Sequence, residues 1–177
     1  MVDGGEKWST VAQHGDERTR RAFEHESERG GGAEMFLGTH YPKLDDKGRL
    51  FLPAKFREQL QGGLVMTKGH EHCIFVFPRD AFMGYAERMQ SAPLSSKDAR
   101  DYMRVLLSAA SDEIPDRQGR VTIPATLRTY AGLNKECVVI GAGSRVEIWD
   151  GAQWDRYMEN SEPAYADLSE EVVPGLM

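Results

Sequence analysis

The sequence predicts an α+β protein in which two tandem modules, built of the same strands and helices in the same order, intertwine as a pseudo-dimer. Three observations lead to this prediction. A thirteen-residue segment occurs twice, short β-type runs alternate with helical periodicity in both halves, and apolar residues make up 40% of the 177 residues. A module of about 50 residues buries too little surface to fold well alone, so we expect the two copies to share one core.

The duplicated segment is the clearest feature of the chain. Residues 45–57, DDKGRLFLPAKFR, recur as residues 116–128, DRQGRVTIPATLR, at an offset of 71 positions. Six of the thirteen positions are identical, where chance would give about one. The duplication therefore predicts two copies of one structural unit.

Each module is expected to contain the same elements in the same order. A glycine turn opens a short strand, and a proline ends that strand and begins a short helix, because the missing proline N–H has no helical partner there. Two strands joined by a glycine-containing turn follow, and an amphipathic helix closes the module. The expected strands are 49–52, 64–67, 73–77, 120–123, 137–140 and 145–149, and the expected first helices are 53–60 and 124–131.

Apolar residues at helical spacing define the closing helix of each module and a further helix between the modules. The linking helix is expected over residues 95–110, with Ser95 as its cap. The residues expected on the packed helix faces are Phe82, Tyr85 and Met89 in the first module, Met103, Leu106, Leu107 and Ala110 in the linking helix, and Trp154, Tyr157 and Met158 in the second module.

Charge is unevenly distributed along the chain, whose formal net charge is −6. The first 34 residues carry −3 and residues 159–177 carry −5, which leaves +2 for the segment between them. Both ends have few large apolar residues and contain glycine or proline, so we expect them to be flexible. The predicted organisation is a flexible N-terminal extension (1–34), a first module (35–92), a linking helix (93–111), a second module (112–158) and an acidic flexible tail (159–177).

Composition excludes several classes of protein. The longest uncharged apolar stretch, residues 137–143, is far shorter than the roughly 20 residues that a membrane span needs. The N-terminal residues lack the apolar block of a secretory signal. Two cysteines, Cys73 and Cys137, cannot build a disulfide framework, so we expect a reducing, cytoplasmic location and no membrane partner.

The duplicated turns concentrate positive charge in an otherwise acidic chain. Residues 43–57 carry a balance of +3 and residues 116–128 a balance of +2. Arginine presents a planar fork that binds guanine O6 and N7, or a phosphate, through two hydrogen bonds, and a neighbouring glycine lets the turn approach DNA closely. The residues expected to bind DNA are Arg49, Lys47, Arg120, Lys43 and Arg117, and the residues expected to act as turn scaffold are Asp45, Gly48, Asp116 and Gly119.

Simpler interpretations exist for each of these features. An isolated Asp-x-x-Gly-Arg turn is ordinary, and its arginine could be solvated or paired within the chain. Arg57 and Arg128 fall on the expected helices, where packing or subunit contacts are the better interpretation.

Other candidate sites are weaker. The run from His70 to Cys73 falls at a hairpin turn without a second ligand cluster, so it does not predict a metal site. The glycines of 141–143 lack the third glycine and the following helix of a dinucleotide-binding turn. Neither a nucleophile elbow nor a phosphate-binding loop is present. We therefore expect no enzyme activity, no metal, no cofactor and no small-molecule substrate.

The two Asp-x-x-Gly-Arg turns, each followed by a strand and Pro-Ala, resemble the MraZ family of bacterial transcriptional regulators, within the AbrB-like, swapped-hairpin DNA-binding superfamily. The Met-Phe-Leu-Gly run at 35–38 and the segment 131–136 are also similar to that family. The family's Asp-x-x-x-Arg signature falls on Asp45 with Arg49 and is repeated at the second turn. The resemblance covers about residues 35–158.

The resemblance implies a sequence-specific transcription factor that binds direct repeats in double-stranded DNA, upstream of the division and cell-wall gene cluster. It also implies a fold of two ββαββ-like modules, head-to-tail ring oligomers and association with the nucleoid. A core of about 120 residues has a diameter of roughly 35 Å, close to one turn of B-DNA, about 34–36 Å. Two alternatives stay open: an antitoxin-like protein that neutralises a protein partner, and a purely structural oligomer.

Overall fold

The computed structural model describes residues 35–90 and 95–167 of the chain. Three segments lie outside the described residues: the expected extension 1–34, residues 91–94, and residues 168–177 of the acidic tail. The described part confirms the α+β class, with antiparallel strands and five α-helices. In chain order the elements are β1 (Phe36–His40), β2 (Arg49–Phe51), α2 (Ala54–Leu60), β3 (Leu64–Lys68), η1 (His70–His72), β4 (Ile74–Pro78), α3 (Arg79–Gln90), α4 (Lys97–Ser108), β5 (Ser111–Glu113), β6 (Arg120–Thr122), α5 (Ala125–Tyr130), β7 (Cys137–Gly143), β8 (Val146–Asp150) and α6 (Gly151–Asp167).

Strands of the two repeats interleave in a six-stranded sheet of order β1-β7-β8-β4-β3-β5. Within the repeats, β3 pairs with β4 and β7 pairs with β8. Every other pairing in this sheet joins the two repeats: β1 with β7, β4 with β8, and β3 with β5. Strands β1, β3 and β4 of the first repeat correspond to β5, β7 and β8 of the second. Exchanging each strand for its counterpart and reversing the order gives the same sheet. The two repeats are therefore related by an approximate twofold axis.

The strands that begin with the duplicated arginines form a second, two-stranded sheet, in which β2 pairs with β6. We call this sheet the β2–β6 ribbon. Leu50 lies opposite Val121, and both side chains are buried. Because side chains alternate along a strand, Arg49, Phe51 and their partners point to the other face of the ribbon.

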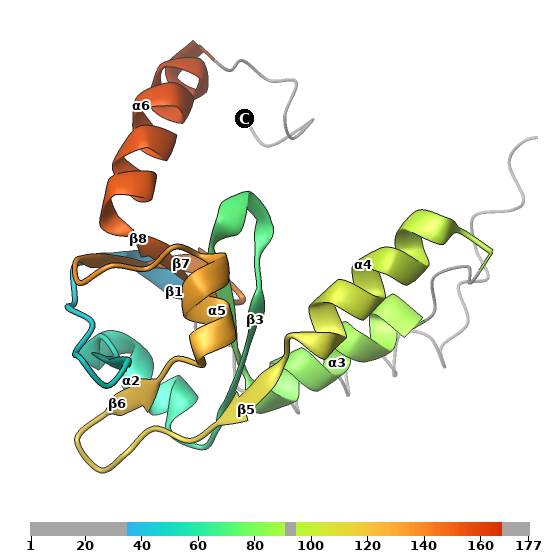
Figure 1. Cartoon of the computed structure of the whole chain (residues 1–177), viewed down its shortest axis with the longest axis horizontal. Helices are drawn as coiled ribbons and strands as arrows, with labels where there is room; N and C mark the ends of the chain where they lie inside the picture. The colour runs from blue at the N-terminus through green and yellow to red at the C-terminus, as the bar shows by residue number, and fades with distance from the viewer. Residues whose placement is uncertain (1–34, 91–94, 168–177) are drawn as a thin grey trace, which may run out of the picture. The chain divides into compact units, whose positions relative to one another are not determined.

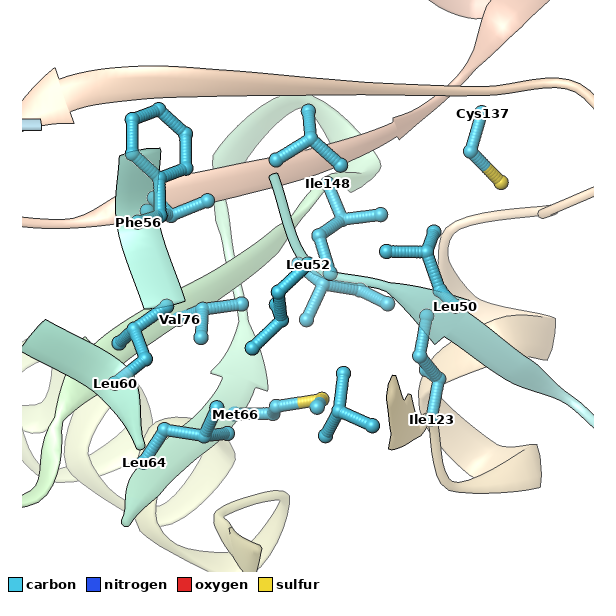
Figure 2. Packing of buried hydrophobic residues seen from close by; sticks show 14 of the residues in the cluster. Leu50, Leu52, Phe56, Leu60, Leu64, Met66, Val76, Ile123, Cys137 and Ile148 are labelled. Carbon is cyan, nitrogen blue, oxygen red and sulfur yellow. The ribbon is translucent and has the colours of Figure 1, made fainter. Parts of the chain in front are cut away.

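The main core lies between the β2–β6 ribbon, the six-stranded sheet and helices α2 and α5. Phe56 and Leu60 of α2 are four positions apart, so both point from one helix face into this core. Figure 2 shows Leu50 from the first repeat and Ile123 from the second lying around Met66 of β3. Both repeats therefore bury their apolar side chains in one shared core.

Two local details differ from the expectations drawn from the sequence. Helix α4 begins after Ser96, whose Oγ accepts a hydrogen bond from the N–H of Ala99, so Ser96 rather than Ser95 is the cap. Strands β1 and β5 were not located from the sequence, because Gly38 interrupts the apolar run of β1 and β5 consists of only three polar residues. Each of them is held by pairing with a strand of the other repeat.

Helices α3 and α4 lie side by side, and α6 leaves the sheet in another direction (Figure 1). The hydroxyl oxygens of Tyr85 and Tyr102 lie 3.0 Å apart across the contact between α3 and α4. Leu106 is buried on the same side of α4, whereas Leu107 is 40% exposed. The expectation that Leu107 is buried was wrong, because consecutive helix positions are about 100° apart and the packed face of α4 is centred on Tyr102 and Leu106.

Helix α6 continues to Asp167, beyond the boundary at residue 158 that the sequence suggested. Residues 159–167 are therefore helical in the structure, although they were assigned to the flexible tail. Pro163 removes one helical hydrogen bond, but the alanines and glutamates around it are good helix formers. None of the helices in the described ranges is long and apolar enough to cross a membrane.

Adjacent residues of β2 test the packing of the ribbon. Leu50 is fully buried and Phe51 is 49% exposed. We expect Leu50→Ala to lower the free energy of unfolding by about 2–5 kcal/mol, because the cavity lies in the core that both repeats share. The matched control, Phe51→Ala, should cost less than about 1 kcal/mol. Urea denaturation measures both values, and equal losses would contradict the orientation of the ribbon.

Candidate nucleic-acid interface

The two duplicated turns have the same internal geometry. In the first turn, one carboxylate oxygen of Asp45 accepts the backbone N–H groups of Lys47 and Arg49, each at 2.9 Å. Its other oxygen accepts from Nε of Arg49 at 2.7 Å. Asp116 binds the N–H groups of Gln118 and Arg120 at 2.9 Å and Nε of Arg120 at 2.8 Å. Each aspartate therefore closes its turn and fixes the direction of its arginine.

The contacts of each guanidinium leave one edge available. In the described part of the chain, the hydrogen bonds of Arg49 and Arg120 to their aspartates use Nε. The two terminal nitrogens of each guanidinium form the opposite edge, and this edge can donate two parallel hydrogen bonds to guanine or to a phosphate. The side chains are 30% and 24% exposed, so a ligand can reach them.

Hydrogen bonds with the arginines shift the acidity of both aspartates. The backbone N–H of Arg49, its side chain and the N–H of Lys47 hold the pKa of Asp45 below the ordinary value of 3.8. The corresponding donors from Arg120 and Gln118 lower the pKa of Asp116. Both carboxylates are thus charged at neutral pH, and each offsets part of the positive charge of its turn.

Each turn rests on the other repeat. The carbonyl of Gly48 accepts the N–H of Ile123, and the carbonyl of Gly119 accepts the N–H of Leu52, at 2.8 and 2.9 Å. Both glycines have φ of +75°, a conformation that residues with a side chain rarely adopt.

Arginines from the opposite repeat pack over these two glycines. The guanidinium of Arg128 lies where a Cβ of Gly48 would be, and a Cβ at Gly119 would lie 2.7 Å from Nε of Arg57. Arg57 also donates to the carbonyl of Leu52 at 2.9 Å. The helix arginines therefore pack against the turn of the other repeat, Arg57 as an exposed residue and Arg128 as a half-buried one.

The β2–β6 ribbon brings the two arginines to one face. Arg49 lies opposite Thr122, and Phe51 lies opposite Arg120. The guanidinium carbon of Arg120 lies 5.8 Å from the centre of the Phe51 ring. We call the outer side chains of these four residues the ribbon face. The two arginines on it come from different repeats.

Sequence reasoning missed Phe51 and Thr122 as members of the ribbon face. The signal was present, since both residues alternate with the buried Leu50 and Val121 along short strands. The pairing of β2 with β6 could not be inferred from that alternation.

The remaining basic residues differ in position. Lys47 and Arg117 are exposed in the two turns, next to the ribbon face. Lys43 is also exposed, but its Nζ lies 3.4 Å from a carboxylate oxygen of Glu136 in the second repeat. The structure therefore groups four of the five expected basic residues in the turns and pairs the fifth elsewhere.

The other candidates from the sequence are parts of the packed structure. The His72 ring lies 5.1 Å from the Tyr130 ring in a tilted arrangement, and the His70 ring lies 5.8 Å from Tyr102, edge to face. Within residues 35–90 and 95–167, no three His, Cys, Asp or Glu side chains gather as metal ligands. Cys73 and Cys137 are buried free thiols, and burial raises the pKa of Cys137 to about 11.

The fold and the site together define a class: an α+β protein of two repeats that share a sheet and present two arginine turns on one ribbon. The family model described as "MraZ protein, putative antitoxin-like" matches residues 35–105 and again 106–173. The chain belongs to the MraZ family.

Similar proteins carry the same family name. The chain is 63% identical over 142 residues to "Transcriptional regulator MraZ" of Clavibacter michiganensis subsp. michiganensis, which covers 80% of this chain and 99% of that protein. It is 62% identical over 142 residues to the Kocuria rhizophila protein of that name, with the same coverage. It is 59% identical over 143 residues to the Frankia alni protein, covering 81% of this chain and 100% of that protein.

Titration of the two aspartates tests the geometry of the turns. We expect ¹³C NMR midpoints below 3.8 for both Asp45 and Asp116. Because the folded pKa values are lowered, this contribution to stability is present above pH 3.8 and is lost as the pH falls through the folded values. In Arg49→Ala the titration midpoint of Asp45 should rise only part of the way toward 3.8, since the backbone N–H donors of residues 47 and 49 remain. Asp116 is the internal control, and its midpoint should not move.

Proposed function

We propose that this protein is a sequence-specific DNA-binding transcriptional regulator and that the ribbon face with its two turns is the DNA-binding surface. The observation that carries the proposal is the pair of matching arginine turns on one ribbon, each arginine directed by an aspartate. The names of the relatives support the regulatory role. An enzyme activity, a cofactor and a small-molecule substrate form no part of this proposal.

We propose that the two repeats form an AbrB-like, swapped-hairpin pseudo-dimer. The exchange of strand partners between repeats supports this arrangement, because β1, β2, β4 and β5 each pair with a strand of the other repeat. The crossed contacts of Arg57 and Arg128 with the opposite turns support it as well. In such an arrangement neither DNA-contacting turn can form without the other repeat.

The proposed roles of the contact residues follow from their chemistry. Arg49 and Arg120 offer a two-nitrogen edge that fits guanine, while Lys47 and Arg117 at the turns suit phosphates. Phe51 suits an apolar contact with a thymine methyl group. Lys43 is the weakest member of the proposed set, since its pairing with Glu136 competes with DNA.

The two turns are not equivalent, and this favours an asymmetric DNA site. Lys47 corresponds to Gln118, and Phe51 corresponds to Thr122. A site read by two different turns has no reason to be palindromic, because palindromes match identical half-surfaces. The asymmetry therefore supports binding to direct repeats.

We further propose that several protomers act together as a head-to-tail ring on such repeats, upstream of the division and cell-wall gene cluster, in the nucleoid. A single protomer offers few basic residues, so its own affinity should be weak. Linked protomers raise the effective concentration of each turn at the next repeat, which multiplies weak contacts into strong binding.

A second candidate is an antitoxin-like role, which the family description "putative antitoxin-like" favours. It requires a protein partner, whereas the proposed function requires DNA. Copurification of a small basic protein that competes with DNA would support the antitoxin-like role.

Substitution of Arg49 tests the DNA-binding surface. We expect Arg49→Ala to weaken binding to the DNA upstream of the gene by roughly 5- to 150-fold, because one two-bond contact to a base is lost. Arg49→Lys should keep the salt dependence of binding and lose the preference over scrambled DNA. Fluorescence anisotropy across a salt series measures both.

The charge-matched control for this experiment is Lys97→Ala on α4. It removes one exposed positive charge outside the turns and should change the affinity less than about 2-fold. Equal weak binding of all variants to both DNAs would refute the proposed surface.

The spacing of the DNA repeats tests the multi-protomer model. Inserting half a helical turn, about 5 base pairs, between repeats places them on opposite sides of the duplex. We expect the affinity to fall to that of a single repeat, whereas an insertion of about 10 base pairs should weaken binding less. Unchanged affinity in a gel mobility-shift assay would contradict the model.

A further inference from the structure

Helices α3 and α6 are counterparts in the two repeats, and each packs through aromatic rings. In the first repeat, Tyr85 of α3 stacks on Phe77 with 5.3 Å between ring centres. In the second, the ring centres of Tyr157 and Trp154 of α6 lie 5.0 Å and 5.4 Å from the ring centre of Trp149. The same kind of surface is thus built twice.

Only one of these two surfaces is covered within the described residues. Helix α4 packs on the first, with Tyr102 Oη 3.0 Å from Tyr85 Oη and Leu106 buried. No helix of residues 35–90 or 95–167 plays this part for the second surface, on which Tyr157 is 39% exposed and Tyr165 is 77% exposed.

The exposed ring residues belong to one stripe of α6. Residues 154, 157, 158, 161 and 165 recur at helical spacing and share one face. Carboxylates lie along one flank of this stripe. They belong to Asp155, Glu159 and Glu162.

Helix α4 has a second apolar surface, opposite to the face that packs on α3. A shallow groove of about 580 Å³ lies there and is lined by Met103, Leu107, Val105 and Arg104, with Arg100 and Ser108 at its edges. Val105 is 51% exposed and Leu107 is 40% exposed. The Arg104 side chain is 72% exposed. This outer face of α4 is apolar and flanked by guanidinium groups.

We propose that the outer face of α4 in one protomer binds the aromatic stripe of α6 in the next protomer. Both surfaces are exposed and apolar. The charges beside them are complementary, with two arginines beside one, of which Arg104 also pairs with Asp101 at 3.2 Å, and three carboxylates beside the other. The chain already shows that α4 can cover the equivalent helix of its own repeat. A second copy of this chain therefore supplies the cover that no helix of the described residues gives to α6.

The contact explains why assembly would be head to tail. The two surfaces differ, and each protomer carries one of each, so every contact leaves a free surface at both ends. Such contacts continue until a ring closes. This inference rests on the proposed ring and names the surfaces that build it.

Two single substitutions, each at an exposed position, test the contact. Leu107→Asp disables only the α4 surface, and Tyr165→Asp disables only the α6 surface. Each variant alone should sediment as a monomer at a concentration where the wild type is fully assembled. An equal mixture should form a one-to-one dimer and nothing larger, because one intact α4 meets one intact α6. Analytical ultracentrifugation measures all of these masses.

Met83→Asp on α3 is the matched control, since Met83 is 55% exposed and lies outside both surfaces. This variant should keep the mass of the wild type. If Leu107→Asp and Tyr165→Asp also keep that mass, the contact is refuted while the ring stands. If their mixture stays monomeric although both are folded by circular dichroism, the contact is also refuted. A monomeric wild type would overturn both the contact and the ring.

The DNA-binding proposal is checked separately on the same samples. Monomeric Leu107→Asp should bind a duplex with one repeat as tightly as the wild type does, because the turns are untouched. It should lose at least about 10-fold on a duplex with several repeats. Loss of the single-repeat binding would refute the proposal that α4 acts only in assembly.

Discussion

The pairing of β2 with β6 is the constraint on which the rest of the site depends. This pairing buries Leu50 and Val121 between the repeats and brings Arg49 and Arg120 to the opposite face. The carbonyls of Gly48 and Gly119 accept hydrogen bonds from the other repeat, which fixes both turns. The core and the ribbon face consequently form together, since each turn is held by hydrogen bonds with the other repeat.

The aspartates hold the arginines of this framework in one direction. Each carboxylate uses three hydrogen bonds to hold a turn and one edge of an arginine, so the guanidinium is directed before any ligand arrives. Directing a long side chain in advance reduces the entropy lost on binding. The cost is a negative charge beside a surface proposed for DNA, which keeps the net attraction of one protomer to phosphate small.

Most of the elements could be predicted from the duplicated segment. Its glycine, proline and apolar positions agree between the two copies and constrain local structure in both. It did not locate β1 and β5, because Gly38 interrupts the apolar run of β1 and β5 consists of three polar residues. Apolar spacing placed Leu107 in the core, and the acidic composition after residue 158 was interpreted as a tail. Neighbouring elements decide the pairing of the two strands and the burial of Leu107, whereas helix formers around Pro163 extend α6.

The sequence by itself determined the family, the two turns and the residue types within them, since these depend on local spacing and on chemistry that each residue carries. Only the tertiary structure decided that the two arginines share a face, that Phe51 lies beside Arg120, and that Arg57 and Arg128 pack on the opposite turns. Partners separated by about 70 positions leave no trace in local periodicity. Their contact follows from the shared burial of both repeats in one core.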